Sequence, residues 1–181
     1  MKQEPLLQVN GLCVEFSTKN GSVRVLNQLD LHLLPGEALG IVGESGCGKS
    51  MTALSIMRLV PTPPGEISNG RILLNGEDVL QLTESQMEDI RGNEISMIFQ
   101  EPMTSLNPVF TIGSQVSENI RRHQSANTSQ AKEKTIQMLE AVGIPAPELR
   151  VDQYPHELSG GMRQRVMIAM ALSCQPSVLI A

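Results

Sequence analysis

Hydrophobic and polar positions alternate near the start of the chain and change to a helical spacing further along. Leu6–Phe16 and Val23–Leu34 place apolar residues at every second or third position, and the Asn-Gly pair between them predicts a β-hairpin. Ala38–Val42 is a short apolar run, which predicts a strand buried on both faces. Ser129–Val142 has apolar residues at helical spacing and is followed by Gly143, a typical helix stop.

The remaining predicted elements continue an order in which strands and helices alternate. Helices are expected over Ser50–Leu59, Ile112–Gln124 and Gly160–Ser173, short strands over Arg71–Asn75, Glu94–Phe99 and Ser177–Ala181, and loops over Pro61–Gly70 and Ile144–Pro155. This order predicts an α/β fold with a parallel sheet, an antiparallel β part at the start and a helical insert.

Composition narrows the functional classes. The 181 residues are 40% hydrophobic and 18% charged, which is ordinary for a globular domain. The net charge of −5 argues against a nucleic-acid binder, which usually has a basic face. Three cysteines, Cys13, Cys47 and Cys174, show no pairing pattern and predict free thiols in a reducing compartment.

No targeting or spanning segment is expected. The first ten residues lack the basic head and apolar run of a signal peptide. The longest apolar stretch, Val166–Leu172, is too short to span a bilayer. We therefore expect any action at a membrane to depend on a partner that spans it.

The strongest motif is Gly43–Ser50, which reads Gly-Glu-Ser-Gly-Cys-Gly-Lys-Ser and matches G-x-x-x-x-G-K-[ST]. Glycines let successive backbone N–H groups point at phosphate oxygens, and the following helix presents its positive N-terminus to the same anion. Lys49 would reach the β- and γ-phosphates, and the Ser50 hydroxyl would bind Mg²⁺. The alternative is an accidental glycine-rich turn, but a chance match in such a chain is on the order of 1%.

A second motif lies at the start of the last predicted helix. Leu158–Arg165 reads Leu-Ser-Gly-Gly-Met-Arg-Gln-Arg, with Ser159 as a natural N-cap. Each glycine costs a helix interior about 1 kcal/mol relative to alanine, so the pair makes sense if something must approach the backbone closely. The helix start would form a second phosphate site. Two such sites suggest a nucleotide shared between two chains.

These two motifs together resemble the nucleotide-binding domain of ABC transporters, and the resemblance covers essentially the whole chain. In that family two domains pair head to tail, with ATP between one phosphate loop and the other chain's LSGG segment. The resemblance implies that Ser159, Gly160 and Gly161 contact the γ-phosphate of the ATP that the partner chain holds.

The resemblance also implies roles for two residues outside the motifs. Gln100 ends the strand predicted before it and matches the family's Q-loop glutamine, which contacts Mg²⁺ and the attacking water. Phe16 lies where the family places an aromatic ring that stacks on adenine, although a plain core role for this phenylalanine stays open. The implied catalytic residues are Lys49 and Gln100, the Mg²⁺ ligands Ser50 and Gln100, and the nucleotide contacts Phe16, Gly43, Glu44, Ser45, Gly46, Cys47, Gly48, Lys49, Ser50, Met51, Ser159, Gly160 and Gly161.

Gln100–Pro108 and Tyr154–Glu157 narrow the resemblance to bacterial peptide importers of the dipeptide, oligopeptide and glutathione group. The implied function is an ATP-binding subunit that couples ATP binding and hydrolysis to peptide import. Its partners would be a second ATPase chain, membrane permease subunits that dock near Gln100–Phe110, and a periplasmic or extracellular solute-binding protein. The ATP-binding subunit would lie at the cytoplasmic face of the bacterial inner membrane.

The given residues end at Ala181, within what the resemblance identifies as the Walker B strand. The family's Mg²⁺-binding Asp and general-base Glu would follow, so we expect a domain truncated before both. Loss of a general base alone typically costs about 10²–10⁴-fold in rate, so the chain alone is predicted to be nearly inactive and poorly stable. We expect a partial ABC ATPase domain, with a β subdomain and phosphate-loop core over 1–100, a mainly helical subdomain over 101–158, and the LSGG helix and first part of the Walker B strand over 159–181.

Two other functions stay open at this point. One is a truncated fragment or pseudogene product that binds nucleotide without hydrolysing it. The other is a soluble ABC ATPase of translation or DNA repair, which the acidic charge and the lack of long heptad repeats disfavour.

Overall fold

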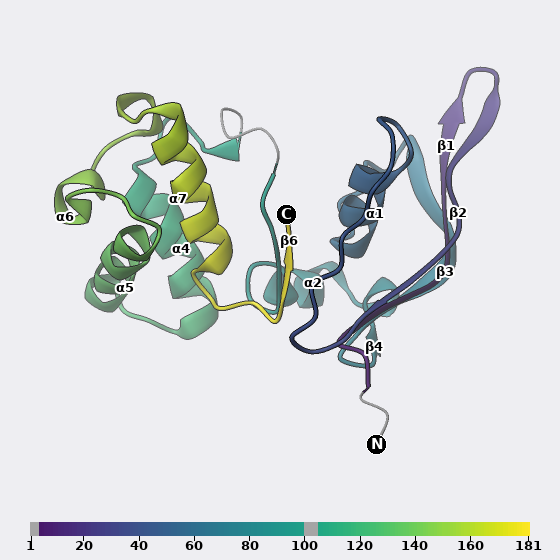
Figure 1. Cartoon of the computed structure of the whole chain (residues 1–181), viewed down its shortest axis with the longest axis horizontal. Coiled ribbons are helices and arrows are strands. Elements are labelled where there is room, and N and C mark those ends of the chain that lie inside the picture. The colour runs from purple at the N-terminus through teal and green to yellow at the C-terminus, as the bar shows by residue number, and fades with distance from the viewer. Residues whose placement is uncertain (1–3, 100–104) are drawn as a thin grey trace. The chain divides into compact units, whose positions relative to one another are not determined.

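The computed structural model describes residues 4–99 and 105–181, and the chain divides into two compact units, Met1–Met87 and Glu88–Ala181 (Figure 1). Each unit is described by itself below. The predicted division at residues 100 and 158 stays a prediction.

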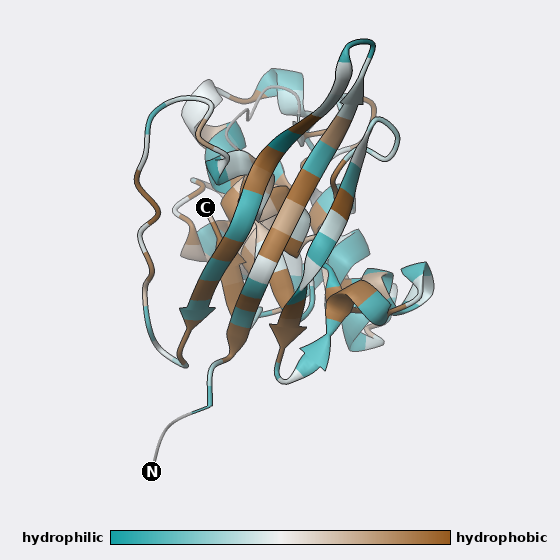
Figure 2. Cartoon of the chain, turned by 90° about the vertical axis from the view of Figure 1, so that its right-hand side faces the viewer, coloured by the Kyte–Doolittle hydropathy of each residue, from teal (hydrophilic) through white to brown (hydrophobic). Residues whose placement is uncertain are grey.

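The first unit is built on an antiparallel sheet. Its strands lie in the order β2-β1-β3-β4, with bounds β1 (Leu7–Thr18), β2 (Gly21–Leu33), β3 (Gly65–Leu74) and β4 (Glu77–Asp78). Thr18 pairs with Gly21, so the predicted Asn-Gly hairpin is confirmed. Apolar and polar residues alternate along these strands (Figure 2). Val9, Leu12 and Val14 on the inner strand β1 are fully buried, as their spacing predicts.

Helix α1 (Lys49–Ile56) begins directly after the glycine-rich loop, in agreement with the predicted helix there. The 3₁₀ turn η1 (Val79–Gln81) and helix α2 (Glu84–Ile90) follow the sheet. Arg58, just beyond α1, donates hydrogen bonds to the carbonyl oxygens of Val79 and Leu82. This arginine therefore ties the end of α1 to η1.

Two sequence predictions in this unit are wrong. Ala38–Val42 is not a buried strand, because its residues are exposed, with Val42 97% exposed. A strand needs hydrogen-bonded neighbours, and no described strand pairs with this segment. Pro61–Gly70 is not all loop, because β3 begins at Gly65 and pairs with Phe16 of β1. Pairing along the sheet overrides the local proline and glycine content there.

The second unit combines a parallel strand pair with a helical group. Strand β5 (Ile95–Met97) pairs in parallel with β6 (Val178–Ile180), so both predicted short strands are confirmed. The helices are α4 (Ile112–Gln124), α5 (Thr128–Ala141), α6 (Pro147–Arg150) and α7 (Gly160–Leu172), with a 3₁₀ turn η2 (Pro155–Glu157). Helix α6 lies in the stretch Ile144–Pro155 that was predicted to be loop, and η2 begins at its last residue. Both begin with proline near the first helical position, where it is well tolerated.

The core of the second unit is aliphatic. It consists of residues from α4, α5, α7 and their connections: Leu106, Ile112, Val116, Ile120, Ala131, Leu139, Ile144, Val151, Leu158, Val166, Met167 and Ala169. The scarcity of aromatic residues in the sequence is thus matched by a core of branched and straight aliphatic side chains. Among the residues described, no helix is long and apolar enough to cross a bilayer.

Candidate functional site

The glycine-rich loop holds its lysine over the loop's own backbone. Lys49, the first residue of α1, donates hydrogen bonds from Nζ to the carbonyl oxygens of Gly43 at 2.5 Å and Glu44 at 2.7 Å. Its Nζ also lies 3.5 Å from Sγ of Cys47. The ammonium group is therefore fixed at the mouth of the loop, where a phosphate group would need a positive charge.

Two glycines give the loop its curl. Gly46 and Gly48 have φ angles of +85° and +94°, which residues with a Cβ rarely adopt. A Cβ on Gly48 would also lie 2.6 Å from Cδ2 of Leu26. Gly43 faces the Cys47 side chain so closely that a Cβ there would collide with Sγ. The sequence motif predicted these glycines, but the support that Leu26 of β2 gives to the loop carries no sequence signal.

Helix α1 begins without a side-chain cap. Its N-cap is Gly48, which offers no side chain, and its first turn contains no acidic residue. The Gly48 carbonyl accepts hydrogen bonds from the Thr52 N–H at 2.8 Å and Oγ1 at 3.0 Å. The first N–H groups of a helix have no partner within the helix, so an uncapped start presents free donors and the positive dipole end to an external anion. Ser50 is exposed in this first turn.

Phe16 pairs with Gly65 of the neighbouring strand β3. A Cβ on Gly65 would come within 2.8 Å of the Phe16 ring and 2.9 Å of Val60 Cγ1, so both side chains lie close to this glycine. Phe16 pairs with Val23 on β2, two residues from Val25, whose carbonyl oxygen lies beside Gly48. Two residues along a strand span roughly 7 Å, so the half-buried ring lies near the base of the loop.

The LSGG segment has a different helix start. Ser159 is the N-cap of α7 in extended conformation, and its Oγ accepts a hydrogen bond from the Met162 N–H at 3.3 Å. Gly160 and Gly161 are exposed, have no positive φ, and a Cβ on either would meet nothing within 4 Å. Packing among residues 4–99 and 105–181 therefore does not require glycine at either position. Open space beside both residues leaves the backbone accessible to a group from outside.

Two arginines anchor the α7 start within its unit. Arg163 Nε donates to the Leu158 carbonyl oxygen at 3.0 Å. Arg165 Nη1 donates to the carbonyl oxygen of Gly143 at 2.7 Å, just beyond the end of α5. A cation at a helix C-terminus satisfies carbonyl groups that the helix leaves without partners. Both arginines belong to the sequence motif, but these anchoring contacts depend on the tertiary fold and carry no sequence signal.

The structure brings most predicted site residues into two places. Phe16, Gly43–Ser50 and Met51 gather in the first unit, and Ser159–Gly161 lie at the α7 start of the second unit. Gln100 lies outside the described residues. Among the residues that are described, no group of three His, Cys, Asp or Glu side chains could hold a metal ion.

Comparison with known proteins gives consistent results. A family model described as ABC transporter matches residues 26–181. The oligopeptide transport ATP-binding protein OppD of Bacillus subtilis is 51% identical over 176 residues, and the dipeptide transport ATP-binding protein DppD of that organism is 48% identical over 178 residues. These matches cover 97% and 98% of this chain but 49% and 53% of those proteins. The chain thus spans about half the length of these curated relatives.

Solved structures with the same fold include the dimeric ATP-binding cassette MJ0796 bound to ADP and Pi. It has a TM-score of 0.83 and 23% identity, and the match covers 96% of this chain and 72% of that one. CbiO1 from Clostridium perfringens, part of the transporter complex cbiONQ, has a TM-score of 0.72 over 98% of this chain and 64% of its own. These likenesses confirm the predicted α/β fold class.

Proposed function

The chain belongs to the ABC transporter family, and from that premise we propose that it binds ATP at Gly43–Ser50 and couples ATP binding and hydrolysis to peptide import. The observation that carries the proposal is the loop itself. Its glycines adopt positive φ angles, its lysine is held at the mouth, and the helix behind it has no side-chain cap. This arrangement suits a triphosphate, because it supplies backbone donors, a helix dipole and a cation at the mouth of the loop.

Each residue of the first unit then has a distinct task. The loop N–H groups bind the phosphate oxygens, and Lys49 exchanges its contacts with Gly43 and Glu44 for the β- and γ-phosphates. Phe16, whose ring is half-buried, would stack on adenine. Charge neutralisation by Lys49 would lower the barrier to phosphoryl transfer, because charge builds up on the transferred oxygens.

Ser50 and Gln100 are the proposed Mg²⁺ ligands in this chain. A serine hydroxyl is an oxygen ligand that suits Mg²⁺, and Ser50 is exposed on the first turn of α1 beside the loop. Bound Mg²⁺ would supply additional positive charge to the β- and γ-phosphates. The Ser50 hydroxyl would bind that ion from the first turn of α1, whose backbone the helix holds in place.

A second ATPase chain completes the proposed site. Ser159, Gly160 and Gly161 of one chain would contact the γ-phosphate held by the loop of the other. Two observations support this pairing. The space beside both glycines is open, and the fold relative MJ0796 is described as dimeric and bound to ADP and Pi. Because glycine has no side chain, a phosphate group could come close to the backbone here. Its oxygens could then accept hydrogen bonds from the first N–H groups of α7.

The transported solute is proposed from the relatives. Proteins that are about half identical to this chain are named as ATP-binding proteins for oligopeptide and dipeptide transport. We propose that this chain serves peptide uptake with membrane permease subunits and a solute-binding protein, at the cytoplasmic face of the bacterial inner membrane. Glutathione is one candidate among these peptides.

Replacement of Lys49 in the source cell tests this proposal. Lys49→Ala removes a charged hydrogen-bond donor, whose loss costs about 1.5–3 kcal/mol, so uptake of a labelled peptide should fall by about 10- to 100-fold or more. Lys19→Ala is the matched control, because Lys19 is exposed in the hairpin turn of the same unit. Wild-type uptake of every peptide by the Lys49→Ala strain would overturn the proposal.

A further inference from the structure

Two aromatic side chains stack on one another just before the LSGG segment. The chain contains one tyrosine, three phenylalanines and no tryptophan. Its tyrosine, Tyr154, is 40% exposed, and the ring centroid lies 5.6 Å from that of exposed His156, with 16° between the two ring planes. Buried aromatic rings contribute strongly to core stability, so a stacked pair that is left at the surface calls for a reason outside the core.

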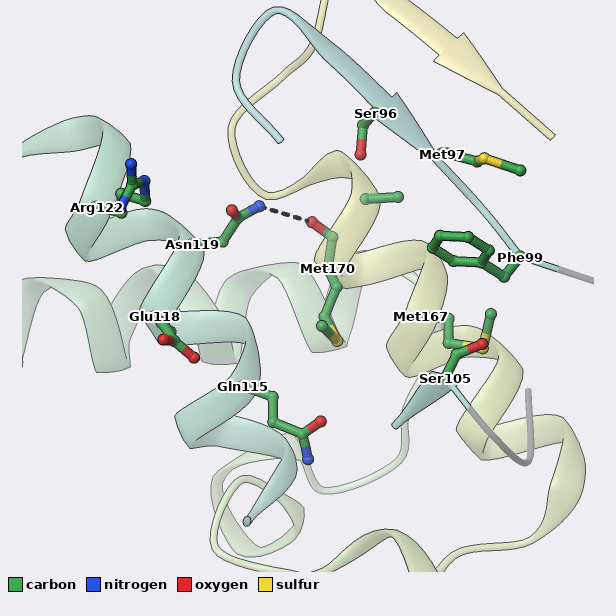
Figure 3. Close-up of a pocket in the computed structure, with 11 residues that line it drawn as sticks. Ser96, Met97, Phe99, Ser105, Gln115, Glu118, Asn119, Arg122, Met167 and Met170 are labelled. Carbon is green, nitrogen blue, oxygen red and sulfur yellow. Dashed lines mark hydrogen bonds between the residues drawn. The ribbon is translucent and has the colours of Figure 1, made fainter. Parts of the chain in front are cut away.

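This ring pair, Tyr154 and His156, forms a surface of its own. The second unit also contains a cavity of about 380 Å³ among β5, α4 and α7 (Figure 3), but neither ring lines it. Among the described residues, no hydrogen bond engages the Tyr154 hydroxyl or a ring nitrogen of His156. The rings and their polar atoms are therefore accessible to a molecule that approaches this surface.

The backbone holds the ring pair in a defined position before α7. The Tyr154 N–H donates to Oε2 of Glu157 at 2.7 Å, and the Glu157 N–H donates to the Tyr154 carbonyl oxygen at 3.0 Å. Pro155, between the two rings, and Leu158, after them, are buried and anchor the turn to the unit. A surface that is already ordered loses little conformational entropy when a ligand binds to it.

The ring pair lies close to the place proposed for the γ-phosphate of a second chain's ATP. His156 is three residues before Ser159, the N-cap of α7, so their Cα atoms are at most about 11 Å apart. An ATP molecule spans a comparable length from its γ-phosphate to its base. A nucleotide whose γ-phosphate meets the start of α7 can therefore bring its base to the ring pair.

We propose that Tyr154 and His156 contact the base of the ATP that the second ATPase chain holds, and so favour purine nucleotides when the two chains pair. This inference rests on the proposed function, because it requires ATP between the phosphate loop of one chain and the LSGG segment of the other. The phosphates would then be held by one chain, while the base is covered by the other. Stacking grows with the area of the rings in contact, so a purine gains more from the ring pair than a pyrimidine.

Nucleotide-driven pairing of the native protein tests the inference. Sedimentation measures the dissociation constant for its pairing with a second ATPase chain, either its own copy or the chain that copurifies with it. The nucleotide is saturating ATP or CTP, and EDTA withholds Mg²⁺ to prevent hydrolysis. Tyr154→Leu keeps apolar bulk but removes the π-system, so ATP-driven pairing should weaken at least about fivefold. CTP-driven pairing should weaken less, because a pyrimidine stacks less.

Three further variants separate stacking from other effects. Tyr154→Phe retains the ring and should pair within about threefold of wild type. His156→Leu removes the second ring and carries the test if Tyr154→Leu unfolds at a lower temperature than wild type. His32→Leu is its matched control, because His32 is an exposed residue of β2 in the other unit. ATP binding to single chains, measured at a protein concentration too low for pairing, should be unchanged in all of these variants.

Three results would overturn the inference. Tyr154→Leu and His156→Leu could pair as tightly as wild type in ATP. Both could weaken ATP-driven and CTP-driven pairing by the same factor, which would leave the ring pair a structural role only. Wild-type chains could bind ATP singly and yet not pair in its presence. Failure of the proposed function gives a different result, because single wild-type chains would then bind ATP no more tightly than Lys49→Ala chains.

Discussion

Glycine is present for different structural reasons at the starts of helices α1 and α7. At α1, Gly48 is required from within, because its φ angle is +94° and a side chain would meet Leu26. At α7, Gly160 and Gly161 meet nothing within 4 Å, and the helix already has a serine cap. The first start is shaped by the fold of its own unit, whereas no residue in the described part of the chain requires glycine at the second.

This difference shows how a glycine motif should be interpreted. A glycine that the local geometry demands is needed by the loop with or without a ligand, so a loss of function on its replacement does not by itself identify a ligand contact. A glycine that costs helix stability and relieves no internal clash points to an external group. The α7 start therefore carries the stronger indication of an approaching partner, even though the α1 loop is the more specific sequence motif.

The largest effect is expected at Gly48. Gly48→Ala should lower the free energy of unfolding by about 1–3 kcal/mol, because alanine is strained at this φ angle and its Cβ approaches Leu26. Gly46→Ala is the control that separates the two causes, since Gly46 also has positive φ but open space around it. Urea unfolding measures both. Equal losses for the two variants would show that the Leu26 contact contributes nothing.

Replacement of Ser159 should have a smaller effect on stability than replacement of Gly48, and should also affect peptide uptake. Ser159→Ala removes the hydrogen bond to the Met162 N–H and should cost about 1 kcal/mol of stability, the usual value of an N-cap. Ser159→Asp keeps a capping oxygen but adds a negative charge where a phosphate group is proposed to bind. We expect it to retain stability while peptide uptake falls. Normal uptake by the aspartate variant would show that no anion approaches this helix start.

Replacement of Gly161 should reduce function without reducing stability. Gly161→Ala should leave the free energy of unfolding unchanged or raise it by up to about 1 kcal/mol, because alanine favours helix and meets no neighbour. ATP-dependent uptake should nevertheless fall, because the added methyl group occupies the space proposed for the γ-phosphate. If the Gly161→Ala variant is both stable and fully active, the proposal that an external group approaches the backbone at Gly161 is wrong.

The smallest expected effect is the pH dependence of stability that His123 contributes. Burial, aided by the positive charge of Arg122, lowers the pKa of His123 on α4. The unfolded chain then binds a proton near pH 6.5 that the folded chain binds only at lower pH. Stability should therefore fall as pH drops through about 6.5 and below, and urea unfolding of His123→Gln should show a weaker fall. Measurements on the α7 variants are best made near pH 8.

The elements that sequence predicted well are those whose pattern is decided locally. Alternation along β1 and helical spacing along α4 and α5 required no knowledge of neighbours, and Ser159 capped α7 as its residue type indicates. The phosphate loop was predictable because phosphate chemistry fixes both its residue types and their spacing.

The predictions that were wrong concern segments whose structure depends on contacts with residues distant in the sequence. Ala38–Val42 has the residues of a buried strand but no described strand beside it, so burial could not follow from its composition. Strand β3 begins within a Pro/Gly-rich stretch because β1 pairs with it. The cavity of the second unit combines side chains from β5, α4 and α7, which are far apart in sequence, so no local pattern could indicate it.

ATP binding by the native protein tests the central claim most directly. Titration of a fluorescent ATP analogue in the presence of Mg²⁺ should give saturable binding that Lys49→Ala weakens by about 10- to 100-fold, while Lys19→Ala leaves it unchanged. Equal affinity of the wild-type and Lys49→Ala proteins would contradict the account, because the one cation held at the mouth of the loop would then play no part in binding the phosphates.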